Sequence, residues 1–89
     1  MTTLHANEAE CAKAGKDVNA IERLARDISR AGRKAKRLGV YVFGGSGTGT
    51  LRCHDTDGGQ PLILATIEGE FDGGDGASRH DAAGLERGE

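Results

Sequence analysis

The chain has 89 residues, with 14 acidic and 12 basic side chains and a formal net charge of −2, so it can hold one domain at most. It has no tryptophan, one tyrosine and two phenylalanines, so any core has to be aliphatic and small. No stretch is apolar for long enough to span a membrane, the first 14 residues lack the apolar run of a secretory signal, and two cysteines make no disulfide framework. We therefore expect a cytoplasmic protein with reduced thiols.

The N-terminal segment, residues 1–15, contains a helix signal. Asn7 lies three residues before Glu10, a variant of the capping box, and predicts a short helix over residues 8–14. Gly15 is suited to end this helix. The alternative is one long helix over residues 8–38 that tolerates Gly15 at a cost of ~1 kcal/mol.

Residues 17–38 have the longest helical period in the chain. Asp17 is placed to cap this helix, and Gly39 to end it. Gly32 lies inside it, where the missing side chain would allow close packing of another element. The apolar positions repeat every three or four residues and form one stripe: Ile21, Leu24, Ala25, Ile28, Ala31, Ala35 and Leu38.

The helix also carries a row of arginines opposite this stripe. Residues 16–38 hold eight positive and three negative side chains, whereas residues 53–89 hold two positive and nine negative ones. Such asymmetry favours charged partners or self-association. The candidate binding residues on this helix are Arg26, Arg30, Arg33 and Arg37.

After Gly39 the period changes to two, which predicts strands. Residues 40–43 and 50–54 read as strands on either side of a flexible glycine loop at 44–49. An Asp-Gly turn at 55–59 leads to a third strand over residues 61–71. We predict an α+β fold in which the long helix packs its apolar stripe on a three-stranded antiparallel meander.

The tail, residues 72–89, is rich in glycine and acidic residues and has few large apolar groups. This composition predicts disorder. The predicted organisation is therefore an N-terminal segment over 1–15, a helix-and-sheet domain over 16–71 and a disordered acidic tail over 72–89.

The first and third strands are apolar on both faces, although a single helix can cover only one. A half-exposed strand would alternate with polar residues. The uncovered face, with Tyr41 and Phe43 as candidate contact residues, therefore favours self-association or a protein partner.

Three other motifs are more typical of a structural role than of catalysis or ligand binding. The glycine loop lacks the Lys-Ser or Lys-Thr and the following helix of a phosphate loop. Cys53 and His54 are strand neighbours that point to opposite faces, and the sequence has no second pair at zinc spacing. The carboxylates at Glu68 and Glu70 read as a solvated strand edge. We predict no enzyme activity, no cofactor and no metal.

These features lead to a non-enzymatic protein–protein interaction module that acts as an inhibitor or adaptor by docking on a partner, with a homodimer as one form. The alternative function is nucleic-acid binding through the basic helix face, with an affinity that falls as salt rises. In its size, acidity and glycine content the chain is similar in style to the small inhibitor and adaptor proteins of phages and mobile elements, anti-CRISPR proteins among them. That resemblance is one of class and involves no shared motif.

Overall fold

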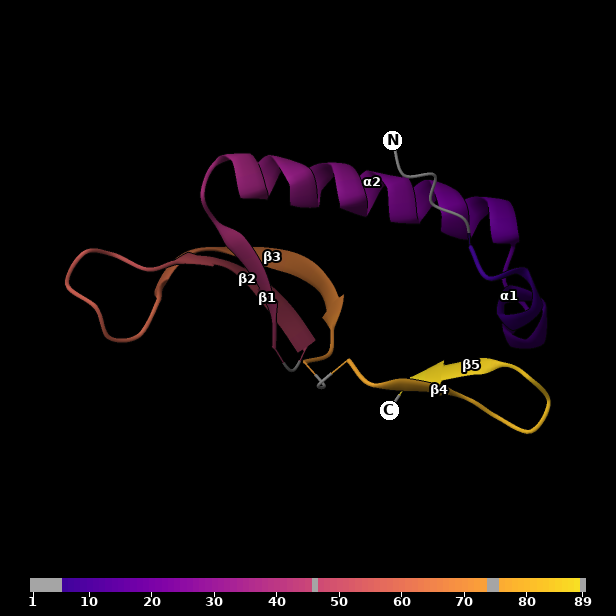
Figure 1. The fold of residues 1–89 in the computed structure, drawn as a ribbon. Helices are drawn as coiled ribbons and strands as arrows, with labels where there is room; N and C mark the ends of the chain where they lie inside the picture. Colours follow the sequence, from indigo (N-terminus) through magenta and orange to yellow (C-terminus); the bar gives the residue numbers. More distant parts are fainter. Residues whose placement is uncertain (1–5, 46, 74–75, 89) are drawn as a thin grey trace. The chain divides into compact units, whose positions relative to one another are not determined.

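The computed structural model describes residues 6–45, 47–73 and 76–88, and its fold is α+β (Figure 1). It contains two helices, a three-stranded antiparallel sheet and a second sheet of two strands. The chain divides into two compact units, one made of residues 1–31 and 76–89 and the other of residues 32–75. The two units are described separately below.

Helix α1 spans Glu8–Ala14, which confirms the predicted short helix and its break at Gly15. Gly15 has φ of 71°, and the N–H groups of Gly15 and Lys16 donate to the carbonyls of Ala12 and Cys11. This pair of bonds is a Schellman motif, in which glycine supplies the left-handed residue. Asn7 is the N-cap residue, but its side chain makes no capping bond, so the predicted capping box does not form.

Helix α2 spans Val18–Arg37, and both of its ends follow the sequence prediction. The carboxylate of Asp17 accepts hydrogen bonds from the N–H groups of Asn19 and Ala20, at 3.4 and 3.3 Å. At the other end Gly39 has φ of 76°, and the N–H of Val40 donates to the carbonyl of Ala35 at 3.0 Å. Each end therefore satisfies backbone groups that a helix terminus leaves without partners.

The predicted close packing at Gly32 is not found. A Cβ atom built at this residue meets nothing within 4 Å among the neighbours considered. Glycine at a helix interior position without such a contact only lowers the helix propensity.

Several apolar side chains of the predicted helical stripe are exposed. Leu24, Ile28 and Leu38 are 54, 63 and 73% exposed. Within the described chain, the buried hydrophobic residues are the small Cys11 and Ala35, at 8 and 9% exposure. Among the described residues no large side chain is fully buried, so the buried positions are small, as the composition predicts.

The three-stranded sheet has the order β1-β2-β3, with β1 at Tyr41–Gly44, β2 at Gly47–Cys53 and β3 at Leu62–Phe71. Both neighbouring pairs are antiparallel, as the predicted meander requires. The strands extend into the glycine stretch that the sequence predicts as a loop. Gly44, Gly47 and Gly49 each have a partner residue on a neighbouring strand.

The ring of Phe71 explains why glycines occupy these strands. A Cβ atom added at Gly49 would lie 2.9 Å from Ile67 Cγ1 and 3.2 Å from Phe71 Cδ2. At Gly69, which has φ of 135°, it would lie 3.0 Å from Phe71 Cε2, and at Gly44 it would lie 3.5 Å from Phe71 Cβ. Glycines therefore make room for the aromatic ring on this face of the sheet.

Over residues 76–88 the tail differs from the predicted disorder, whereas residues 74, 75 and 89 of the predicted tail lie outside the described residues. Ser78–His80 (β4) pairs antiparallel with Glu86–Gly88 (β5), and we call this pair the tail hairpin. The N–H of Glu86 donates to Glu10 Oε2 at 2.6 Å, and Asn7 Nδ2 donates to Glu86 Oε2 at 3.2 Å. Composition predicted disorder because this segment has few apolar groups to bury. Polar contacts, rather than buried apolar groups, hold it in place.

Across the described residues, no helix has both the length and the apolar character needed to cross a membrane.

Candidate functional site

One face of the three-stranded sheet carries the two aromatic residues of β1 and an arginine of β2. In the register, Tyr41 lies opposite Arg52, Phe43 lies opposite Thr50, and Arg52 lies opposite Ile63. Residues directly opposite in an antiparallel ladder share a face, and so do residues two apart on one strand. We call this the aromatic face: Tyr41, Phe43, Thr50, Arg52 and Ile63.

The guanidinium of Arg52 stacks on the ring of Phe43. Arg52 Cζ lies 4.1 Å from the ring centroid, and Arg52 Nε donates a hydrogen bond to Thr50 Oγ1 at 2.8 Å. A cation–π contact at an exposed position contributes ~0.5–1 kcal/mol, and the hydroxyl fixes the orientation of the guanidinium. The remaining N–H groups of Arg52 are held in a defined position above an aromatic surface.

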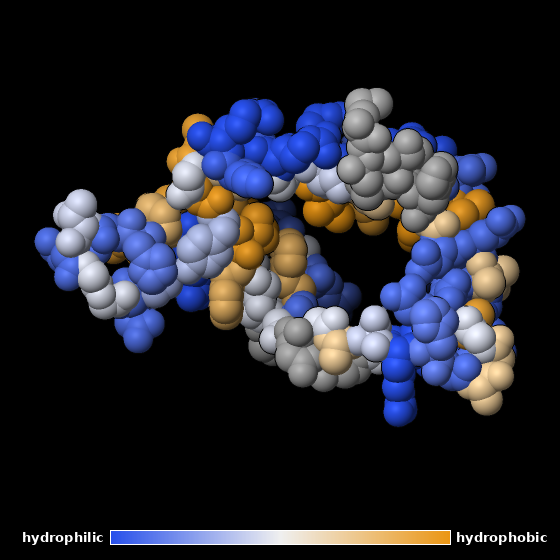
Figure 2. Space-filling model, in the orientation of Figure 1, coloured by the Kyte–Doolittle hydropathy of each residue, from blue (hydrophilic) through white to orange (hydrophobic). Residues whose placement is uncertain are grey.

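The aromatic face is open to solvent. Tyr41, Phe43 and Ile63 are 41, 44 and 59% exposed. The opposite side of the strands is similarly open, since Val42 and Leu62 are 45 and 47% exposed. Figure 2 shows apolar residues at the surface over the sheet region of the molecule. Contiguous exposed apolar side chains are typical of interaction surfaces.

Arg52 is the residue that the sequence analysis missed as a candidate. The two-residue period of the second strand was a signal for it, because that period places Arg52 and Thr50 on one face. Its contact with Phe43, however, depends on the cross-strand register, which the sequence leaves open.

The structure gives Cys53 and His54 different neighbours. The ring of His54 lies 6.5 Å from that of Tyr41, centroid to centroid, whereas Cys53 lies opposite Leu62 in the β2–β3 register. Cys53 is a free thiol. The different neighbours of these two residues agree with the alternation of strand side chains.

The predicted arginines of α2 lie in both units. Arg26 Nη2 lies 3.7 Å from Glu22 Oε2, and Arg30 Nη1 lies 3.5 Å from Asp27 Oδ1. Exposed pairs of this kind contribute ~0.2–1 kcal/mol at most. The other two predicted residues, Arg33 and Arg37, are exposed and belong to the unit of residues 32–75.

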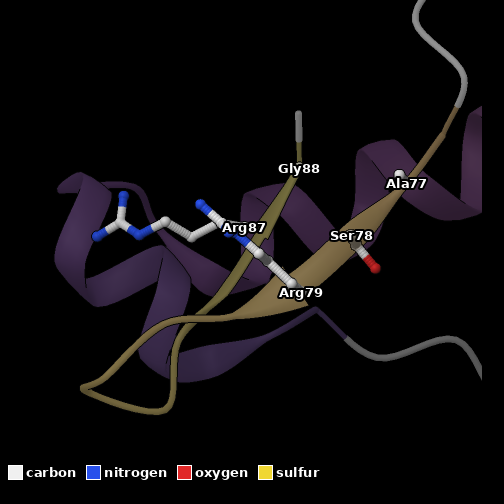
Figure 3. Close-up of a pocket in the computed structure, with 5 residues that line it drawn as sticks. All are labelled: Ala77, Ser78, Arg79, Arg87 and Gly88. Atoms are coloured by element: carbon white, nitrogen blue, oxygen red, sulfur yellow. The ribbon is translucent and has the colours of Figure 1, made fainter.

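A second charged region lies on the tail hairpin. Arg79 and Arg87 are direct cross-strand partners, and they line a surface depression with Ala77, Ser78 and Gly88 (Figure 3). Arg87 Nε donates to Asp81 Oδ2 at 2.6 Å. Like charges directly opposite one another destabilise a strand pair, so this ion pair offsets part of that repulsion.

Asp81 organises the turn of this hairpin. Its Oδ1 accepts hydrogen bonds from the N–H groups of Ala83 and Leu85, at 2.9 and 3.0 Å. The hydrogen bond from Arg87, followed by that from the Leu85 backbone, lowers the pKa of Asp81 below its ordinary value of 3.8. The carboxylate form is therefore the one that fits the hairpin.

Among the described residues, no group of three or more His, Cys, Asp or Glu side chains is arranged to hold a metal ion. Comparisons with protein-family models, with curated proteins and with solved structures find no match to this chain.

Proposed function

We propose that the chain is a non-enzymatic protein-interaction module, acting as an inhibitor or adaptor, and that it docks on a partner protein through the aromatic face. The observation that carries the proposal is the stack of the half-buried Arg52 on the exposed ring of Phe43. Tyrosine and arginine are enriched among the residues that dominate binding energy at interfaces, and aromatic residues in general are enriched at interfaces.

The energetics fit this role. Covering the half-exposed side chains of Tyr41, Phe43 and Ile63 would gain on the order of 2–4 kcal/mol from apolar burial alone. The hydrogen bond to Thr50 holds the guanidinium of Arg52 in place before binding, which reduces the side-chain entropy lost on association. The free N–H groups of Arg52 would suit a carboxylate or carbonyl on the partner.

The test is a capture experiment with the tagged full chain in an extract of the source cell. We expect one or more proteins to be retained by the wild type and to fall at least tenfold with Phe43→Ser and with Arg52→Gln. Lys34→Ala is the matched control, because Lys34 is an exposed residue of α2. Circular dichroism would verify that each variant keeps its fold.

Equal retention of the same proteins by the wild type, the control and both variants would refute docking through this face. If the wild type captures no protein above a tagged blank, the interaction module itself is refuted.

A further inference from the structure

The tail hairpin carries two arginines that face each other across its strands. Arg79 lies directly opposite Arg87 in the register, so both side chains leave the same face. In Figure 3 they extend to one side of the hairpin, whereas the Ser78 hydroxyl extends to the other. The depression that they line with Ala77, Ser78 and Gly88 has a volume of about 200 Å³. Two cationic side chains thus border one hollow on the surface.

This face of the hairpin has more positive than negative charge. In the part of the chain that the structure describes, Asp81 is the carboxylate paired with Arg87, and no carboxylate is paired with Arg79. Glu86 lies on the other face, because it precedes Arg87 along β5, and Asn7 Nδ2 donates to it there. Two guanidinium groups therefore share one carboxylate, and one positive charge is left over.

The contact with Asp81 orients the guanidinium of Arg87. Asp81 Oδ2 accepts from Arg87 Nε at 2.6 Å, while Oδ1 accepts from the N–H groups of Ala83 and Leu85. The two Nη atoms of Arg87 face away from this contact as a pair of parallel donors, the arrangement that binds an oxyanion through two hydrogen bonds. Because the turn holds Asp81, this donor pair is in place before a ligand binds.

The charges and donors of this face fit a phosphoryl group. Such a group carries a charge of about −1.5 to −2 at pH 7 and three acceptor oxygens. A carboxylate offers two oxygens and one charge, and Asp81 already supplies one carboxylate to Arg87. The Cβ atoms of directly opposite strand residues lie about 4.5–5.5 Å apart, so a single phosphoryl group can contact both guanidinium groups.

We propose that Arg79 and Arg87 form a binding site for a phosphoryl group, supplied as free phosphate or as a phosphate monoester. The bound group joins β4 to β5 at the pair that like-charge repulsion otherwise weakens. Each strand has three residues, and a two-stranded hairpin is marginally stable by itself. A ligand that binds only the folded hairpin therefore stabilises it.

The test is an NMR titration of the full chain with sodium phosphate at neutral pH, in which sodium chloride keeps the ionic strength constant. We expect the amide signals of residues 78–80 and 86–88 to shift until they saturate. Arg79→Gln should weaken this binding at least tenfold, because it removes one of the two donor groups, and the loss of a like-charge repulsion should leave the hairpin folded. Arg23→Gln is the matched control and should bind as the wild type does, because Arg23 is an exposed arginine of α2 in the same unit.

Two further titrations separate the sources of the ligand. Tighter binding of O-phosphoserine than of phosphate would identify a phosphate monoester as the ligand, and the reverse would identify free phosphate. Acetate that binds as tightly as both would overturn a phosphoryl site.

Wild-type hairpin signals that do not saturate with phosphate would also overturn the proposal, and so would unchanged binding by a folded Arg79→Gln variant. Should Arg79→Gln lose the hairpin, hydrogen exchange in the wild type decides. The amides of residues 78–80 and 86–88 should gain protection when phosphate is added, and the absence of that gain would overturn the site. The aromatic face belongs to the unit of residues 32–75, so its capture experiment succeeds or fails independently of this site.

Discussion

The three-stranded sheet and the tail hairpin are held together by different forces. In the sheet, the side chains of Ile67 and Phe71 pack closely against Gly49, and the Phe71 ring packs against Gly69. In the tail hairpin, Asp81 receives two backbone N–H groups and the guanidinium of Arg87. Side-chain packing thus stabilises the three-stranded sheet, whereas charged hydrogen bonds stabilise the tail hairpin.

Because of this difference, we expect the two regions to respond to different perturbations. Apolar contacts do not titrate, so the sheet should depend on side-chain volume and not on the protonation of Asp81. The tail hairpin should depend on that protonation and hardly on volume. The following predictions examine the contrast, from the largest expected effect to the smallest.

Replacement of Phe71 should have the largest effect. Phe71→Ala removes the ring that covers the strand glycines, and since Phe71 is half-buried we expect a loss of about 2–3 kcal/mol in the free energy of unfolding. Urea denaturation measures it. Phe43→Ala is the matched control, because the Phe43 ring contacts Arg52 on the exposed face and should cost under ~1 kcal/mol. Equal losses for the two variants would contradict the assignment of Phe71 as the packing centre.

Replacement of Gly49 should have the next largest effect. In Gly49→Ala the added methyl would lie within 3.0 Å of two carbon atoms of Ile67, so we expect a loss of about 1–2 kcal/mol from overpacking. The control is Gly32→Ala, where the methyl meets open space inside a helix. That variant should gain about 0.5–1 kcal/mol. A stabilised Gly49→Ala variant would show that this strand has spare volume.

Acidification should open the tail hairpin, with the smallest effect on the whole chain. The pKa of Asp81 is lowered in the folded state, so its contribution to stability is present above pH 3.8 and is lost as the pH falls through the lower, folded value. Amide NMR signals of Ala83 and Leu85 would report the loss of their hydrogen bonds.

Asp81→Asn provides the matched comparison for this titration, because asparagine keeps the shape and loses the charge. In that variant the Ala83 and Leu85 signals should no longer depend on the protonation of residue 81. If the wild-type hairpin stays intact at pH values well below 3.8, interactions other than those of the Asp81 carboxylate stabilise it.

Local signals in the sequence were sufficient to locate the helices. Asp17 and Gly39 mark the ends of α2, because a capping carboxylate and a left-handed glycine act within a few residues of the chain. The strand order followed for the same reason, since short connections leave few arrangements. The exposure of Tyr41 and Phe43 was predicted from the two-sided apolar pattern.

The sequence could not supply what depends on contacts between distant residues. Composition predicted a disordered tail, and the hairpin was missed because the Glu10–Glu86 contact joins residues far apart in the sequence, while the Asp81–Arg87 pair forms only when the hairpin closes. A weak local signal was present, namely Asp81 three residues before Gly84, whose φ is 84°. The Arg52–Phe43 stack was missed for the same reason.

The two free cysteines have a practical consequence. Cys11 is 8% exposed in α1, whereas Cys53 is half-buried at the end of β2, opposite Leu62. A thiol-reactive dye should therefore label Cys53 first, since access limits the reaction at Cys11. The unaltered chain thus carries its own labelling position beside β3, without an added residue.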